Sequence, residues 1–120
     1  MKENVILEKS RSFGIRVVKM YRYLREEKRE YVLSRQVLRS GTSIGANISE
    51  AQRGQSRADF YSKMCIAQKE AKETEYWLRL LYEGGYLSDR EFQSITRDLD
   101  EVLSLLHAIC KKTRINLDLA

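Results

Sequence analysis

Apolar and small side chains recur at alternating steps of three and four residues along nearly the whole chain, and this periodicity constrains the fold more than any other feature. A repeat of about 3.5 residues keeps one face of a helix turned toward its neighbours at a shallow crossing angle. Four such stripes are present, and the 120-residue chain contains no proline to interrupt them. We therefore predict an all-α fold, an antiparallel four-helix bundle in up-down-up-down order.

The stripes divide a single domain, residues 1–120, into four predicted helices at roughly 4–27, 32–53, 57–83 and 89–114. The pattern stops near Asn116, and the chain is expected to fray from there on. The stripe residues are, in chain order, Ile6, Ser10, Phe13, Val17, Met20 and Leu24; Leu33, Val37, Ser40, Ile44, Asn47 and Ala51, with Ile48 beside them; Phe60, Met64, Ala67, Ala71, Thr74, Leu78 and Leu81; and Phe92, Ile95, Leu99, Val102, Leu106 and Ile109.

Short breaks separate the stripes and carry the residues that begin and end helices. Ser56 is a candidate N-cap, and Asp59 follows three residues later, where a carboxylate suits the helix dipole. Gly84-Gly85 can adopt the left-handed conformation that ends a helix. Ser88-Asp89-Arg90-Glu91 has the form of a capping box. Because the breaks are short, consecutive helices are expected to be antiparallel neighbours.

The segment 39–50 is unusually rich in small residues for a helix. Gly41 and Gly45 are one turn apart, and each costs roughly 1 kcal/mol relative to alanine, so close approach of another helix is expected to offset the cost. A phosphate loop is not favoured, because the segment lacks the Gly-Lys-Ser/Thr ending and follows no strand. A catalytic Ser43 is not favoured either, since no acid is placed to orient His107, the only histidine.

Geometry favours a structural role for this segment. If the helices at 32–53 and 57–83 fold back on each other, Arg39 lies level with Glu70 and one turn from Glu73. We predict that Arg39 pairs with one of these carboxylates and that Ser43 and Asn47 hydrogen-bond across the two helices. Polar groups placed in this way fix the register of a helix pair. The predicted polar junction consists of Arg39, Ser43, Asn47, Glu70 and Glu73.

The two cysteines and the first residues of the sequence indicate the cellular compartment in which we expect the protein. Cys65 and Cys110 belong to no CxxC or metal-binding spacing, so we expect free, buried thiols in a reducing compartment. No pattern indicates a metal site or a cofactor. Charged residues follow Met1 at once, which predicts no signal peptide, and no apolar run approaches the ~20 residues of a membrane span. We expect a cytoplasmic protein.

More apolar side chains are present than the core of one bundle requires. A wide core face is one interpretation. A homo-oligomer interface, where Trp and Tyr are common, is the other, and we favour it. The surplus side chains lie beside the stripes of the last two predicted helices and are Tyr61, Cys65, Tyr76, Trp77, Leu80, Leu103 and Leu105.

Positive charge is concentrated in the first half of the chain. Residues 1–53 hold 12 Lys/Arg against 6 Asp/Glu, whereas residues 54–120 hold 10 against 11, and the total charge is +5. This asymmetry favours an anionic partner, nucleic acid first, although a solvated surface of salt-bridged helices has the same composition. Arg22, Arg25 and Arg29 are expected to share one helix face along which a phosphate backbone could run.

Aromatic residues are interleaved with this basic helix, where they could stack on bases. They are Tyr21, Tyr23 and Tyr31. The candidate nucleic-acid contacts are Lys9, Arg16, Lys19, Arg22, Arg25 and Arg29. The alternative is that this face is solvated, or that it meets an acidic surface on another protein.

The segment Arg39–Ile48 also resembles the signature of the "four helix bundle protein" family, the 23S rRNA-intervening-sequence (S23) proteins. Similar stretches are Glu3–Ile6, Gly54–Phe60, Lys69–Leu78 and Gly85–Leu87, so the resemblance covers nearly the whole chain. It implies a four-helix bundle that assembles as a homopentamer. Many members are encoded within insertions in 23S rRNA genes. A related group comprises accessory proteins of diversity-generating retroelements, basic pentamers thought to bind nucleic acid and a reverse transcriptase.

We therefore predict a non-enzymatic, oligomeric bundle protein that binds nucleic acid or serves as a ribonucleoprotein accessory factor. The alternative is a structural module that binds other proteins and has no nucleic-acid role. An enzyme is disfavoured because no paired-carboxylate, metal-ligand or nucleophile pattern is present.

Overall fold

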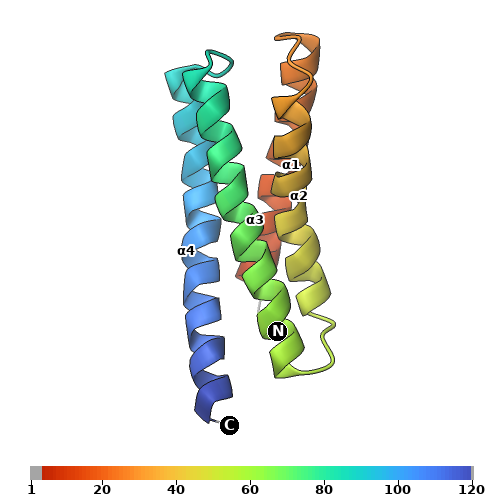
Figure 1. Cartoon of the computed structure of the whole chain (residues 1–120), viewed down its shortest axis with the longest axis vertical. Coiled ribbons are helices and arrows are strands. Elements are labelled where there is room, and N and C mark those ends of the chain that lie inside the picture. The colour runs from red at the N-terminus through yellow and green to blue at the C-terminus, as the bar shows by residue number, and fades with distance from the viewer. Residues whose placement is uncertain (1–3, 120) are drawn as a thin grey trace.

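The computed structural model describes residues 4–119, which form four helices and no strand (Figure 1). The helices are α1 (Val5–Glu26), α2 (Leu33–Ala51), α3 (Arg57–Glu83) and α4 (Asp89–Leu119). They run up, down, up and down, so the α1–α2 and α3–α4 turns lie at one end of the bundle and the α2–α3 turn lies at the other. The all-α, four-helix prediction is confirmed.

Consecutive helices pack closely, whereas α1 and α4, which close the bundle, pack least closely of the neighbouring pairs. The bundle is elongated, with extents of 51 × 26 × 21 Å. None of the helices described is both long enough and apolar enough to cross a membrane.

The core is made of the predicted stripes. All six stripe residues of α1 are buried. In α2 and α4 the buried positions include Ile48 and Cys110, whereas the predicted Asn47 and Ile109 are only half-buried. A straight helix has 3.6 residues per turn, so its buried face drifts away from a strict 3.5-residue repeat along its length. The stripe prediction was wrong at those two positions for this reason. Three further stripe residues are also only half-buried, each in the first turn of its helix: Leu33, Phe60 and Phe92.

The predicted caps of α3 and α4 are confirmed. The Ser56 hydroxyl accepts from the Asp59 backbone N–H, at 3.1 Å. The Ser88 hydroxyl accepts from the Glu91 N–H at 3.1 Å, and the Glu91 carboxylate accepts from the Ser88 N–H at 2.8 Å. Gly85 adopts a positive φ of 89° where α3 ends. Both ends of the last hairpin turn are therefore specified locally.

The C-terminal helix is longer than predicted, because α4 continues to Leu119 rather than ending near residue 114. No glycine or proline follows Gly85 in the sequence. Once a helix is nucleated, each further residue adds a hydrogen bond at little cost, so the loss of an apolar stripe alone does not end it.

The start of α2 depends on a carboxylate that no familiar sequence signal marks. Glu30 is only 7% exposed and accepts from the backbone N–H groups of Val32, Leu33 and Ser34, at 3.1, 2.9 and 2.6 Å. The Ser34 hydroxyl donates in return to the Glu30 carbonyl, at 2.9 Å. Arg29, immediately before, has a positive φ of 53°. Glu30 thus serves the donors that a helix N-terminus leaves unpaired, and its negative charge lies at the positive end of the helix dipole.

Candidate nucleic-acid interface

The small-residue segment of α2 forms a packing seam with its two neighbours. A Cβ added to Gly41 would lie 2.9 Å from the methyl carbons of Val17 on α1, and one added to Gly45 would lie 3.4 Å from the carbonyl oxygen of Ser10. Both glycines therefore permit close approach of α1, as expected. On its other side, the buried Ser40 hydroxyl accepts from the Thr74 hydroxyl of α3, at 2.9 Å.

Arg39 reaches across from α2 to both carboxylates that the register indicated. Its Nη1 lies 3.5 Å from Oε1 of Glu70, and its Nη2 contacts Oε2 of Glu73. The Trp77 indole N–H donates to the same Glu73 oxygen, at 3.1 Å. The predicted pairing is present and involves two acids rather than one.

The predicted cross-helix hydrogen bonds of Ser43 and Asn47 were wrong. The Ser43 hydroxyl donates to the Arg39 carbonyl at 2.6 Å, and the Asn47 amide donates to the Ser43 carbonyl at 2.8 Å, both within α2. Short polar side chains on a helix bond readily to the carbonyl four residues earlier. The bond between α2 and α3 is made instead by Ser40 and Thr74. We call Arg39, Ser40, Gly41 and Gly45 the α2 seam.

Two of the six candidate nucleic-acid contacts, both on α1, form ion pairs with α4. Lys9 pairs with Glu101 of α4, at 3.0 Å. Arg16 pairs with Asp98 at 2.7 Å and donates to the carbonyl and hydroxyl oxygens of Ser94, at 3.1 and 3.0 Å. These side chains join α1 to α4, the pair that packs least closely. Their charge is largely committed to that role.

Lys19 and Arg22 are both exposed on α1, and no carboxylate of residues 4–119 lies within 4.0 Å of either. Arg25 lies over two aromatic rings, 5.3 Å from the centroid of Tyr21 and 5.1 Å from that of Tyr31. A guanidinium held in this way is attracted to the faces of the rings beside it. We call Lys19, Arg22 and Arg25 the basic face.

Arg29 does not share a helix face with Arg22 and Arg25, so that part of the prediction was wrong. Helix α1 ends at Glu26, and Arg29 lies in the turn with left-handed backbone. The turn follows because Glu30 must fold back to cap α2. Arg29 is exposed at the same end of the bundle as the basic face and adds charge there.

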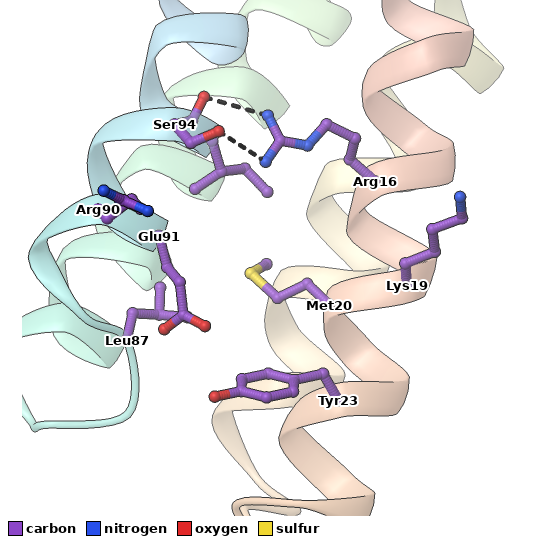
Figure 2. Close-up of a pocket in the computed structure, with 9 residues that line it drawn as sticks. Arg16, Lys19, Met20, Tyr23, Leu87, Arg90, Glu91 and Ser94 are labelled. Carbon is purple, nitrogen blue, oxygen red and sulfur yellow. Dashed lines mark hydrogen bonds between the residues drawn. The ribbon is translucent and has the colours of Figure 1, made fainter.

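A groove of about 440 Å³ lies between α1 and α4, next to the α3–α4 turn (Figure 2). Met20, Tyr23 and Leu87 contribute an apolar lining, and Lys19 and Arg90 lie at its edge. Figure 2 shows Arg16 reaching across one end of the groove to Ser94.

One acid, Glu91, also lines this groove. The Ser88 backbone N–H, more than any other group, lowers the pKa of Glu91, so this carboxylate is ionised at neutral pH. The charges around the groove are therefore mixed, with cations from α1 and α4 outnumbering one capped carboxylate.

This groove was not predicted. It depends on how loosely α1 and α4 meet, and a pairing between the first and last helices leaves no local sequence signal. Tyr23, an aromatic residue flanking the α1 stripe, was the only available indication. Within the described part of the chain, no three His, Cys, Asp or Glu side chains form a group that could hold a metal ion.

The fold and this surface define a small four-helix-bundle protein with a basic, tyrosine-rich region on α1 and the turn after it. Residues 2–108 match the family described as 23S rRNA-intervening sequence protein, and the chain belongs to that family. The family resemblance inferred from the sequence is thereby confirmed.

A solved structure is similar as well. It is the 1.70 Å crystal structure of a protein with unknown function from the S23 ribosomal protein family of Bacteroides thetaiotaomicron VPI-5482. The two chains are 51% identical and superpose with a TM-score of 0.87, over 88% of this chain and 98% of that one. A comparison with curated proteins gave no match.

Proposed function

We propose that this protein is a non-enzymatic nucleic-acid-binding factor, of the ribonucleoprotein accessory kind, and that it binds through the basic face and the α1–α2 turn. One observation carries the proposal: Lys19 and Arg22 are exposed on one helix with no acid partner among residues 4–119. Cations left unpaired by the fold can neutralise phosphates and release their counterions, which supplies most sequence-independent affinity.

The tyrosines beside these cations support the same proposal. Tyr31 is 42% exposed and shares the Arg25 guanidinium with Tyr21, while the Lys28 ammonium lies 5.9 Å from the ring centroid of Tyr23. Base–aromatic stacking is worth about 1–3 kcal/mol per base and tolerates any sequence. Stacking needs unpaired bases, so the proposal includes a preference for single strands or loops.

We further propose that the protein acts in the cytoplasm as a homo-oligomer, a pentamer as the family resemblance implies. Supporting this, Ile66 of α3 is 39% exposed. On α3, Tyr76 is 56% exposed and packs edge-on against Trp77. Exposed apolar and aromatic side chains of this kind are typical of interfaces. No cofactor is needed for such binding.

The test is a titration of the purified protein against labelled single- and double-stranded RNA and DNA of unrelated sequences. Binding is expected at 50 mM salt and should weaken by about 10-fold or more at 200 mM, because a few phosphate contacts are lost to competing ions. No binding at 50 mM salt would reject the nucleic-acid proposal and favour a protein partner. Light scattering at micromolar concentration tests the assembly, and a monomer would reject it.

A further inference from the structure

The fold brings the two cysteines of the chain level with each other on adjacent helices. Tyr82 near the end of α3 stacks on Phe92 near the start of α4, with ring centroids 4.3 Å apart. Cys65 lies 17 residues before Tyr82, and Cys110 lies 18 residues after Phe92. Because the helices are antiparallel and both rise about 1.5 Å per residue, these nearly equal separations place the two cysteines within about one residue of the same height.

Both cysteines line one open cavity of about 460 Å³ between α3 and α4, with Tyr61, His107 and Arg114 around it. Neither is in a disulfide. Their exposure differs: Cys65 is half-buried at the cavity, whereas Cys110 is only 7% exposed. Cys65 is therefore the more accessible of the two residues.

The two thiols face the same cavity from adjacent helices. Burial above all, and next the nearby Cys65 thiol, raises the pKa of Cys110 to about 12. The Cys65 thiol is also the largest cause that raises the pKa of Tyr61. Cys65 therefore lies between a cavity-lining hydroxyl and a second, protected sulfur.

We propose that Cys65 and Cys110 form an oxidation site, at which hydrogen peroxide converts the two thiols to a disulfide that joins α3 to α4. The Cys65 sulfur attacks one peroxide oxygen, the O–O bond breaks, and water leaves behind a sulfenic acid. The Cys110 sulfur then attacks the Cys65 sulfur, the S–O bond breaks, and a second water leaves with the Cys110 proton. The two thiols lose two electrons and two hydrogens in total, and the peroxide is reduced to two molecules of water.

The division of roles follows from the exposure of the two side chains. Cys65 can meet the oxidant through the cavity, and Cys110 is more protected but lines the same cavity at nearly the same height. Redox-sensing cysteines are often solvent-accessible thiols next to a resolving cysteine. Cys65 lies in the first third of α3 and Cys110 in the last third of α4, so the cross-link joins the two helices toward the end opposite their turn. The site is independent of the basic face on α1.

The test treats the reduced, purified protein with hydrogen peroxide and measures intact mass and thiol content after denaturation. We expect both thiols to be lost, the mass to fall by two hydrogens, and the chain to remain a monomer on a non-reducing gel. Dithiothreitol should restore both thiols. The oxidised form should also melt at a higher temperature than the reduced form, because the cross-link restricts the unfolded chain.

Two single-cysteine variants assign the steps. In Cys110→Ser, Cys65 should form a sulfenic acid that dimedone traps, whereas in Cys65→Ser, Cys110 should keep its thiol under the same exposure. Circular dichroism checks that both variants are folded. The proposal is overturned if the wild type keeps both thiols, forms only disulfides between chains, or adds oxygen at Cys65 while Cys110 stays reduced.

Discussion

The α2 seam and the basic face are both rich in polar residues, yet they differ in where those residues find partners. In the seam, Arg39 pairs with Glu70 and Glu73, and Ser40 bonds to Thr74, so the polar groups face neighbouring helices. On the basic face, Lys19 and Arg22 have no acid partner within residues 4–119. A polar group whose partners are internal holds the fold, and one whose partners are absent is available to another molecule.

Charge reversal on the basic face should have the largest effect, a loss of nucleic-acid affinity. The variant Lys19→Glu/Arg22→Glu should lose about 10- to 100-fold in affinity for single-stranded RNA at 50 mM salt. The slope of log affinity against log salt concentration should also decrease by the amount expected for about two phosphate contacts. Fluorescence anisotropy at several salt concentrations measures both quantities.

The matched control is Lys111→Glu/Lys112→Glu, two exposed lysines of α4 whose reversal changes the net charge equally. It should weaken binding only a few-fold, on the order of a general field effect. Equal losses in the two double variants would mean that binding depends on net charge alone and not on α1.

Removal of the Glu30 cap tests how much the internal hydrogen bonds at the start of α2 stabilise the fold. Glu30→Ala leaves three backbone N–H groups of the first turn without their carboxylate and should lower the free energy of unfolding by about 2 kcal/mol. Glu30→Gln keeps one oxygen acceptor and should lose about half as much, since only the charge and one acceptor are gone. Urea denaturation gives both values, and an unchanged midpoint for Glu30→Ala would contradict this role.

The Arg39 ion pairs should contribute less, because Arg39 itself is half-exposed and solvent screens its charge. Arg39→Ala nevertheless leaves the buried Glu70 Oε1, which has no hydrogen-bond partner, without its cation, so a loss of about 1–2 kcal/mol is expected. Arg97→Ala, an exposed arginine of α4 with no ion pair among the described residues, should change stability by less than about 0.5 kcal/mol. Similar losses in both variants would show that the pairs do not stabilise the seam.

Substitutions at two glycines should have the smallest effects on stability, and the two effects should be opposite in sign. Gly41→Ala places a methyl 2.9 Å from two Val17 carbons and should cost about 1 kcal/mol net, because overpacking exceeds the gain in helix propensity. Gly14→Ala on α1 meets nothing within 4 Å and should gain about 0.5–1 kcal/mol. Thermal or urea unfolding shows whether each variant is more or less stable. A gain in stability for Gly41→Ala would mean that the close packing of α1 on α2 does not depend on a glycine there.

The fold was predictable because its signals are local. The α1 stripe, the Ser56 cap and the Ser88–Glu91 box each depend on spacing within one or two turns. The Arg39 pairing was also accessible, since a short turn fixes which residues of two helices are level.

What could not be predicted depends on choices between competing partners or on distant contacts. Ser43 and Asn47 had a carbonyl available in their own helix, and spacing alone could not show that they would use it. Lys9 and Arg16 looked like the other α1 cations, but they pair with α4, which lies far away in the sequence. The role of Glu30 depends on the backbone turn at Arg29, for which the sequence has no glycine.

The loose meeting of α1 and α4 has a consequence for how the chain folds. Every other neighbouring pair of helices joins consecutive segments, so most of the native structure has low contact order and can form quickly as hairpins. The α1–α4 pair alone must close a loop that spans the domain, and it gains the least packing from doing so. This pair is therefore where we expect the last step of folding and the first local opening of the native state.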